Sequence, residues 1–333
     1  MRRITGKMLF VLCAVLLFSN PVTAEEKPLR IGWVFAMANA PVVVADRKGF
    51  FKDEGLNVEI IQFTSGPVVH QALAAGELDM AYIGTPPVYH WFSRGLESRI
   101  LAKVNYGQAS VVARKDSGVN TVADLKGKKL AGVKRGSGMD VLLRGYVLKD
   151  TGQLDADKDV AIISMPSGNM MPSVEEKVVD AAFMWEPFTS QSLARGNTKI
   201  VLDVNAAEPN YPWYVVMAMP ATMEKRKDEV VKALRAHKKA IDYLNSSPTA
   251  GNDVIVETFK IDAIMSPDGK NISAFDIVGD ARKRLGWQYE LTDKDMAFVQ
   301  RLMTYSFNLG FIRKELKVDD IIDRSYMKAA MVN

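Results

Sequence analysis

The sequence has little of what covalent or metal-dependent catalysis usually requires. It contains one cysteine, Cys13, and three histidines in 333 residues. His70, His90 and His237 have no partner at metal-ligand spacing, and no G-x-S-x-G nucleophile motif occurs. His237 falls on the apolar stripe of a predicted helix, which is typical of a buried core histidine. We therefore expect no catalytic residue, no metal and no cofactor.

The sequence also lacks a strong charge of one sign. Its formal net charge is +4, and its basic clusters are short. Long repeats and Gly/Ser linkers are absent as well. This balance gives no reason to expect nucleic acid as a partner.

The first 24 residues have the pattern of a secretory signal peptide. Arg2, Arg3 and Lys7 precede an apolar run over residues 8–18, and Val22-Thr23-Ala24 supplies the small residues of a cleavage site. We predict cleavage after Ala24 and a periplasmic location. Lipidation of Cys13 is disfavoured, because Leu12 is too large to precede a lipidated cysteine. Cleavage removes three basic residues and no acidic one, which lowers the net charge to +1 over 309 residues, and it also removes the only cysteine.

The remaining chain alternates between strand and helix patterns, which indicates an α/β fold. The predicted strands cover residues 29–35, 58–63, 80–84, 100–104, 110–114, 130–133, 160–164, 181–185, 200–202 and 215–219. The first three strands each lead into a helix start, where unpaired N–H groups favour an anion. In open α/β sheets, ligands bind at the carboxyl ends of the strands.

Several motifs resemble one family of transport proteins. They are Gly49-Phe50-Phe51-Lys52-Asp53-Glu54-Gly55-Leu56, Phe63-Thr64-Ser65-Gly66-Pro67, Ala74-Ala75-Gly76-Glu77-Leu78-Asp79, residues 117–131, Val179-Asp180-Ala181 and Trp185-Glu186-Pro187. The sequence from residue 29 to about 245 resembles the periplasmic substrate-binding proteins of ABC importers for nitrate, taurine and alkanesulfonates. This resemblance implies a two-lobed periplasmic-binding-protein fold of type II, in which each lobe is a mixed sheet flanked by helices and the ligand cleft lies between the lobes.

The resemblance also implies the domain boundaries. Lobe one is expected to comprise residues 25–112 and 213–333, and lobe two residues 113–212. The chain would cross between lobes at residues 110–114 and return near residues 211–214. Later helical segments around residues 275–285, 296–307 and 318–322 are expected to pack on lobe one.

Candidate ligand contacts from lobe one follow the strand ends. They are Phe35, Asn39, Ser65, Gly66 and Thr85, with Tyr214 from the return crossing. Ser65 could act only as a helix cap, because residues 64–67 form an ordinary helix start with a proline. Aromatic residues at positions 89–91 either enclose a bulkier or cationic ligand or belong to the core.

Candidate contacts from lobe two are Arg135, Ser137, Gly138, Trp185 and Glu186. The loop over residues 132–138 lacks the spacing of a nucleotide-binding motif, but its glycines suit a smaller anion. Ser137 could also cap a helix, with Asp140 as its capping-box partner. Trp185 has burial between helices as its alternative. Glu186 could bind a ligand amine, or form a structural ion pair with Arg135 or Lys134.

The resemblance implies a monomeric, exported binding protein. It would capture a small organic anion, an alkanesulfonate or a taurine-like molecule, and deliver it to an ABC permease with its ATPase. A periplasmic ligand sensor, or a binding protein for a pyrimidine, thiamine-precursor-like or aromatic ligand, remains the alternative. The pyrimidine-precursor synthase of thiamine biosynthesis is similar in fold, but it is cytosolic and relies on a histidine and a cysteine-rich iron-binding region. The export signal and the absence of cysteine from the mature chain argue against that enzyme.

Overall fold

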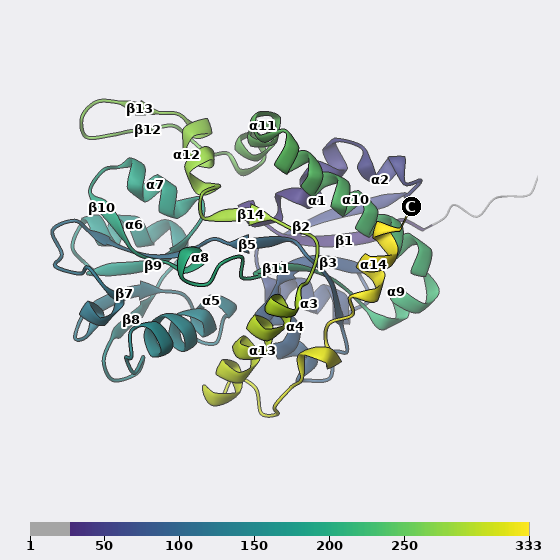
Figure 1. Cartoon of the computed structure of the whole chain (residues 1–333), viewed down its shortest axis with the longest axis horizontal. Coiled ribbons are helices and arrows are strands. Elements are labelled where there is room, and N and C mark those ends of the chain that lie inside the picture. The colour runs from purple at the N-terminus through teal and green to yellow at the C-terminus, as the bar shows by residue number, and fades with distance from the viewer. Residues whose placement is uncertain (1–26, 333) are drawn as a thin grey trace, which may run out of the picture.

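Two five-stranded sheets, each covered by helices, form the centre of the protein (Figure 1). The structure is a computed structural model that describes residues 27–332, so the predicted signal peptide lies outside the described residues. The first sheet contains β1 (Leu29–Val34), β2 (Val58–Phe63), β3 (Met80–Gly84), β4 (Arg99–Lys103) and β11 (Tyr214–Ala218). The second contains β6 (Ala109–Arg114), β7 (Lys129–Gly132), β8 (Ala161–Ser164), β9 (Ala181–Trp185) and β10 (Thr198–Asp203).

The two sheets share one topology. Their strand orders are β2-β1-β3-β11-β4 and β8-β7-β9-β6-β10. In each sheet, three neighbouring strands are parallel and the next strand, β11 or β6, is antiparallel to both of its neighbours. In each sheet, the antiparallel strand is the first one after the chain crosses from the other sheet. The chain crosses from β4 of the first sheet to β6 of the second, and returns from β10 to β11. The predicted mixed sheets are therefore present.

Helices cover both faces of each sheet. They are α1 (Ala40–Arg47), α2 (Phe50–Asp53), α3 (Gly66–Ala74), α4 (Thr85–Phe92), α5 (Gly138–Val141), the π-helix η3 (Leu142–Thr151), α6 (Ser167–Glu175), α7 (Phe188–Ala194), α8 (Val204–Ala207), α9 (Pro220–Lys225), α10 (Lys227–Ser246), α11 (Pro248–Phe259), α12 (Ala274–Ala281), α13 (Asp293–Asn308) and α14 (Ser325–Met331). Short 3-10 turns are η1 (Met37–Asn39), η2 (Val122–Leu125) and η4 (Val318–Asp320).

Strand β3 shows why helices cover both faces of the first sheet. All five of its residues are buried, and alternate side chains point to opposite faces of the sheet. Met80 and Tyr82 join a core cluster with α1 and α10, whereas Ala81 and Ile83 join a cluster with α3, α4 and α13. This continuous apolar strand therefore packs against a helical layer on each face of the sheet.

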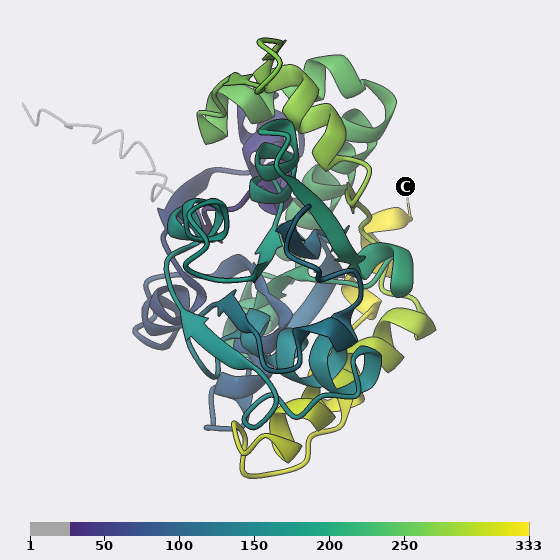
Figure 2. The ribbon, with the colours of Figure 1, turned by 90° about the vertical axis from the view of Figure 1, so that its left-hand side faces the viewer.

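The C-terminal part of the chain contacts both sheet layers, which the sequence did not indicate. After α11, the chain forms the hairpin β12 (Ile264–Met265) and β13 (Asn271–Ile272), then α12, which packs on α7 of the second layer. The next strand, β14 (Leu285–Trp287), pairs with β5 (Asn105–Gly107) between the two sheets. Figure 2 views the molecule from the side of the second sheet, with α12 and α13 at opposite ends.

Two expectations about this region are corrected. The segment 275–285 is not one helix, because α12 ends at Ala281 and the chain turns into β14. Nor do the C-terminal helices pack on the first layer alone, since α12 contacts α7 and α13 contacts both α4 and η3. The sequence pattern predicts the local helices, but not the elements that these helices contact. Within residues 27–332, no helix combines the length and the apolar character that crossing a membrane would need.

Candidate functional site

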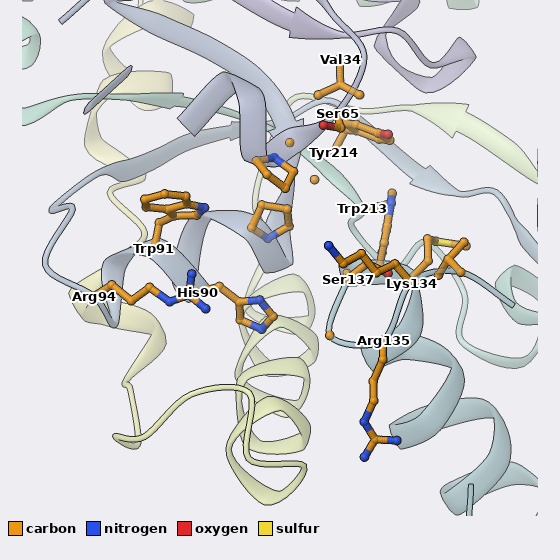
Figure 3. A pocket seen from close by; sticks show the side chains of 18 residues that line it. Val34, Ser65, His90, Trp91, Arg94, Lys134, Arg135, Ser137, Trp213 and Tyr214 are labelled. Atoms are coloured by element: carbon orange, nitrogen blue, oxygen red, sulfur yellow. The ribbon is translucent and has the colours of Figure 1, made fainter. Parts of the chain in front are cut away.

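A cavity of about 490 Å³ lies where the two layers meet, at the carboxyl ends of β1, β2, β3 and β7. Its size is within the usual range for small-molecule sites. One wall comes from the start of α3, from α4 and from the start of β11, and the other from the loop after β7 (Figure 3). Of the predicted contacts, the structure brings together Ser65, Gly66, Arg135, Ser137, Gly138 and Tyr214.

The start of α3 provides hydrogen-bond donors to the cavity. Ser65 is the N-cap residue, but its hydroxyl makes no capping hydrogen bond, so it stays available to a ligand. The first hydrogen bond of the helix runs from Val69 N to Ser65 O, 3.3 Å, so the N–H groups of Gly66 and Val68 precede it. Gly66 is needed for close packing, because a Cβ at this position would lie 3.0 Å from Cγ of Pro87.

The start of α4 does not provide the amides that the strand ends had led us to expect. The Thr85 N–H and hydroxyl both donate to the carbonyl oxygen of Trp213, at 2.9 and 2.8 Å, and Thr85 is fully buried. The next two residues, Pro86 and Pro87, have no N–H. Thr85 therefore fixes α4 to β11 and does not line this cavity.

The exposed side of α4 lines the cavity instead. It contributes Pro87, His90 and Trp91, and Arg94 follows just after the helix ends. The sequence had left open whether the aromatic residues at positions 89–91 enclose a ligand, and it had not indicated Pro87 or Arg94. Burial, together with nearby Arg94, lowers the pKa of His90 to about 4, so this imidazole is neutral at pH 7. His90 Nε2 lies 3.0 Å from Oγ of Ser306 on α13. The spacing of residues 87, 90, 91 and 94 along one helix face was the signal that could have identified this wall.

The loop after β7 forms the opposite wall. The Ser137 hydroxyl accepts a hydrogen bond from Asp140 N at 3.4 Å, and the Asp140 carboxylate accepts one from Gly136 N at 2.8 Å. Ser137 is thus a helix cap that also lines the cavity. Gly138 allows the two walls to approach, because a Cβ there would lie 3.1 Å from Cγ of Pro86.

The two basic residues of this loop differ in their partners. Arg135 lines the cavity with its first atoms, but its guanidinium points away and binds Asp157, at 2.5 and 3.1 Å (Figure 3). This pairing, supported by Arg144, lowers the pKa of Asp157 to about 2. Lys134 points its amine into the cavity, and it has no ion-pair partner among residues 27–332.

Phe35, Asn39 and Trp185 do not line this cavity. Phe35 is 43% exposed and packs against Trp33 and Phe259, with ring centroids 5.8 and 5.1 Å away. Asn39 is fully buried and donates from Nδ2 to the carbonyl oxygen of Val34 at 2.7 Å. Trp185 is half-buried and packs against Phe188 of α7, at 5.9 Å between centroids.

Glu186 is also outside the cavity, and its partner is not the predicted one. It is 1% exposed, and its Oε1 lies 2.5 Å from Nε of Arg284 in an ion pair. Its Oε2 accepts hydrogen bonds from the Ser190 hydroxyl, 2.7 Å, and N–H, 3.2 Å. The proposed bridge to Arg135 or Lys134 is therefore wrong. Burial raises the pKa of Glu186, and Arg284 opposes that rise.

The charges that line the cavity are of one sign. Arg94, Lys134 and Arg135 are present, and the described lining contains no aspartate or glutamate. Apolar and aromatic side chains occupy much of the remainder, including Trp91 and Trp213. No cluster of three or more potential metal-binding side chains occurs in the part of the chain that the structure describes. The site therefore has the chemistry to hold an anion with an apolar body.

Comparisons with known proteins find relatives along most of the sequence. A candidate aliphatic sulfonates-binding protein of Bacillus subtilis (strain 168) is 27% identical over 340 residues, covering 98% of this chain and 97% of the relative. The nitrate/nitrite binding protein NrtA of Nostoc sp. is 24% identical over 361 residues, covering 92% of this chain and 76% of the relative.

Solved structures show the same fold. The periplasmic aliphatic sulphonate binding protein SsuA of Escherichia coli superposes with a TM-score of 0.75 at 19% identity, covering 90% of this chain and 92% of SsuA. The desulfurization enzyme DszB also shares the fold, with a TM-score of 0.64 at 16% identity, covering 91% of this chain and 98% of DszB. These matches confirm the expected periplasmic-binding-protein fold. The model of the NMT1-like family matches residues 22–258, more than half of the sequence, and the chain therefore belongs to the NMT1-like family.

Proposed function

We propose that this protein is the exported binding component of an ABC importer, and that it captures a small organic anion in the cavity between its two sheets. The observation that carries the proposal is the charge of the cavity: helix N–H groups and basic side chains line it, without a carboxylate in the described lining. The permease and its ATPase would receive the loaded protein. The pattern of residues 1–24 supports export, and we expect the mature chain to act as a monomer without a cofactor.

An alkanesulfonate fits this cavity better than a taurine-like zwitterion. A sulfonate at the start of α3 can accept hydrogen bonds from the Ser65 hydroxyl and the Gly66 N–H, which replace its hydration. An ammonium group would need a carboxylate, but the one that we had considered, Glu186, is occupied by Arg284. Trp91, Trp213 and Met139 offer an apolar surface to the organic part of the ligand.

The lobe boundaries at residues 112 and 212 remain part of this proposal. The membership of β11 (Tyr214–Ala218) in the first sheet supports the boundary at residue 212, whereas the boundary at residue 112 falls inside β6 (Ala109–Arg114) of the second sheet. A ligand held by Ser65 from one layer and by the residue 133–139 loop from the other would draw the two layers together. The permease would then recognise the closed form.

Isothermal titration calorimetry with ethanesulfonate, benzenesulfonate, nitrate and taurine tests the proposal. We expect the two sulfonates to bind and to raise the melting temperature by mass action. Ser65→Ala should weaken sulfonate binding about 10- to 100-fold, the scale of one charge-assisted hydrogen bond of roughly 1.5–3 kcal/mol. Ser246→Ala, at an exposed serine on α10, is the matched control. Absence of sulfonate binding, or an equal loss in both variants, would contradict the proposal.

A further inference from the structure

Two basic side chains face the cavity without a counter-charge. Arg94 extends from the end of α4, and Lys134 from the loop after β7, so they belong to different sheet layers (Figure 3). Neither forms an ion pair with any residue in the range 27–332. Among those residues, the Arg94 guanidinium lies 5.8 Å from the ring centroid of Trp91 and close enough to His90 to lower the pKa of that imidazole. Arg135, in contrast, is neutralised by Asp157.

The surroundings do not balance these two charges. The described lining of the cavity contains no carboxylate, and His90 beside Arg94 is neutral because of burial. Unbalanced positive charges around one concave surface raise the local concentration of anions and stabilise a bound anion. Both side chains are exposed, so they can reorient toward a ligand.

A single sulfonate at the start of α3 does not account for both cations. Ser65 lies on one side of the cavity, whereas Arg94 lies beyond Trp91 on α4 (Figure 3). The lining also includes the apolar side chains of Pro87 and Trp91. The cavity therefore offers cationic side chains in addition to the hydrogen-bond donors at Ser65 and Gly66, together with an apolar surface.

We propose that the ligand is an organic dianion, with a sulfonate at the start of α3 and a second acidic group, such as a carboxylate, bound by Arg94 and Lys134. This inference rests on the proposed function, because it places the first anionic group at Ser65. Since Arg94 and Lys134 come from different layers, the second group also links the two walls. The preference would be for two negative charges, and a zwitterion would be rejected.

The test compares two probes of nearly the same shape. These are 4-sulfobenzoate, which carries two negative charges, and 4-carbamoylbenzenesulfonate, in which a neutral amide replaces the carboxylate. Calorimetry at 50 mM salt should show the dianion binding at least about 10-fold more tightly, the scale of a charge-assisted hydrogen bond. The advantage should shrink as salt is raised, because both cations are exposed.

Variants then test whether Arg94 and Lys134 bind the second anionic group. Arg94→Met and Lys134→Met should each remove most of the advantage of the dianion, because each should weaken the dianion more than it weakens 4-carbamoylbenzenesulfonate, which carries one negative charge. Lys134→Arg should retain the advantage, and Lys52→Met, an exposed lysine on α2, should have no effect.

The outcomes separate the two proposals. Equal affinity for the two probes would overturn the dianion inference while the proposed function stands, because both sulfonates would still bind. A dianion advantage that survives in both methionine variants would overturn its assignment to Arg94 and Lys134. If neither probe binds, and ethanesulfonate and benzenesulfonate also fail, the proposed function itself fails and the inference falls with it.

Discussion

Removal of Arg284 should strongly destabilise the protein, because its side chain is buried and pairs with a buried carboxylate. Arg284 follows α12 and binds Glu186, which follows β9, so the pair joins the C-terminal part of the chain to the second sheet. Arg284→Met leaves the Glu186 carboxylate buried, with Ser190 as its remaining hydrogen-bond partner. Breaking a buried ion pair in this way typically costs about 3–5 kcal/mol.

The reciprocal change should cost less. Glu186→Gln leaves Arg284 with a second carboxylate, Asp280, and with the Ser190 hydroxyl. The loss should therefore be about 1–3 kcal/mol, the scale of an imperfectly satisfied buried polar group. Because Glu186 does not line the cavity, the affinity for ethanesulfonate and for taurine should not change. A selective loss of taurine binding would restore a direct ligand role for Glu186.

Thermal unfolding measures these differences. At about 2–4 °C per kcal/mol, Arg284→Met should lower the melting temperature by on the order of 6–20 °C. The double variant, Glu186→Gln with Arg284→Met, should lose less than the sum of the single variants, because neither charge is then left alone. If Arg284→Met is no worse than the surface control Lys52→Met, the reasoning is refuted.

The same variant predicts a pH dependence. Burial raises the pKa of Glu186 in the folded protein, and Arg284 limits that rise. When the pKa of a carboxyl group is higher in the folded state than in the unfolded state, the group does not destabilise the folded state at low pH, where it is protonated in both states. As pH rises from the unfolded pKa toward the folded pKa, the free energy of unfolding falls. Arg284→Met raises the folded pKa further. Its stability deficit relative to the wild type should therefore shrink as pH falls from 7 to 5, and a constant deficit would contradict a charged Glu186.

Two further predictions concern packing and processing. Gly145 in η3 has no space for a side chain, because a Cβ would lie 2.3 Å from Cγ of Tyr305. Gly145→Ala should lower the free energy of unfolding, measured by chemical denaturation, by about 1–3 kcal/mol. Gly168→Ala, where a Cβ would have nothing within 4 Å, should change it by no more than about 0.5 kcal/mol. The secreted protein should begin at Glu25, as read by intact mass; a retained N-terminus or a lipid on Cys13 would show this prediction to be wrong.

The strands were predictable because their signal is local. Predicted boundaries for Val58–Phe63, Met80–Gly84 and Ala181–Trp185 match the structure, and the other strands of the two sheets differ by one or two residues. The same holds for α10, whose predicted apolar stripe is buried. His237 on that stripe is buried as expected, with Nδ1 3.1 Å from the Tyr82 hydroxyl and Nε2 2.9 Å from the carbonyl oxygen of Lys103. Periodicity alone determines which side of such an element faces the core.

The candidate site was predictable only where it depends on one strand end and the turn after it. Ser65, Gly66, Ser137 and Gly138 follow their strands directly, and all four line the cavity. The error at Thr85 was avoidable, because the two prolines that follow it cannot donate hydrogen bonds. Glu186 was different: its partner is 98 residues away, in a segment whose position the sequence pattern does not specify.

That distant segment limits how the two layers can move. One core cluster contains Ile83 of β3, Phe183 of β9 and Leu302 of α13, so α13 packs within the core of both layers. The Arg284 to Glu186 ion pair adds a second link, between the C-terminal part of the chain and the second sheet.

Motion between the layers should therefore preserve these links, and β14 paired with β5 lies between the sheets as the natural axis. The walls then separate at the cavity, where Pro86 meets Gly138. A ligand that binds Ser65 and Arg94 on one wall and Lys134 on the other acts at the place where the two layers are free to part. The position of the unpaired cations and the position of the C-terminal links thus lead to the same expectation, that charge on the ligand controls closure.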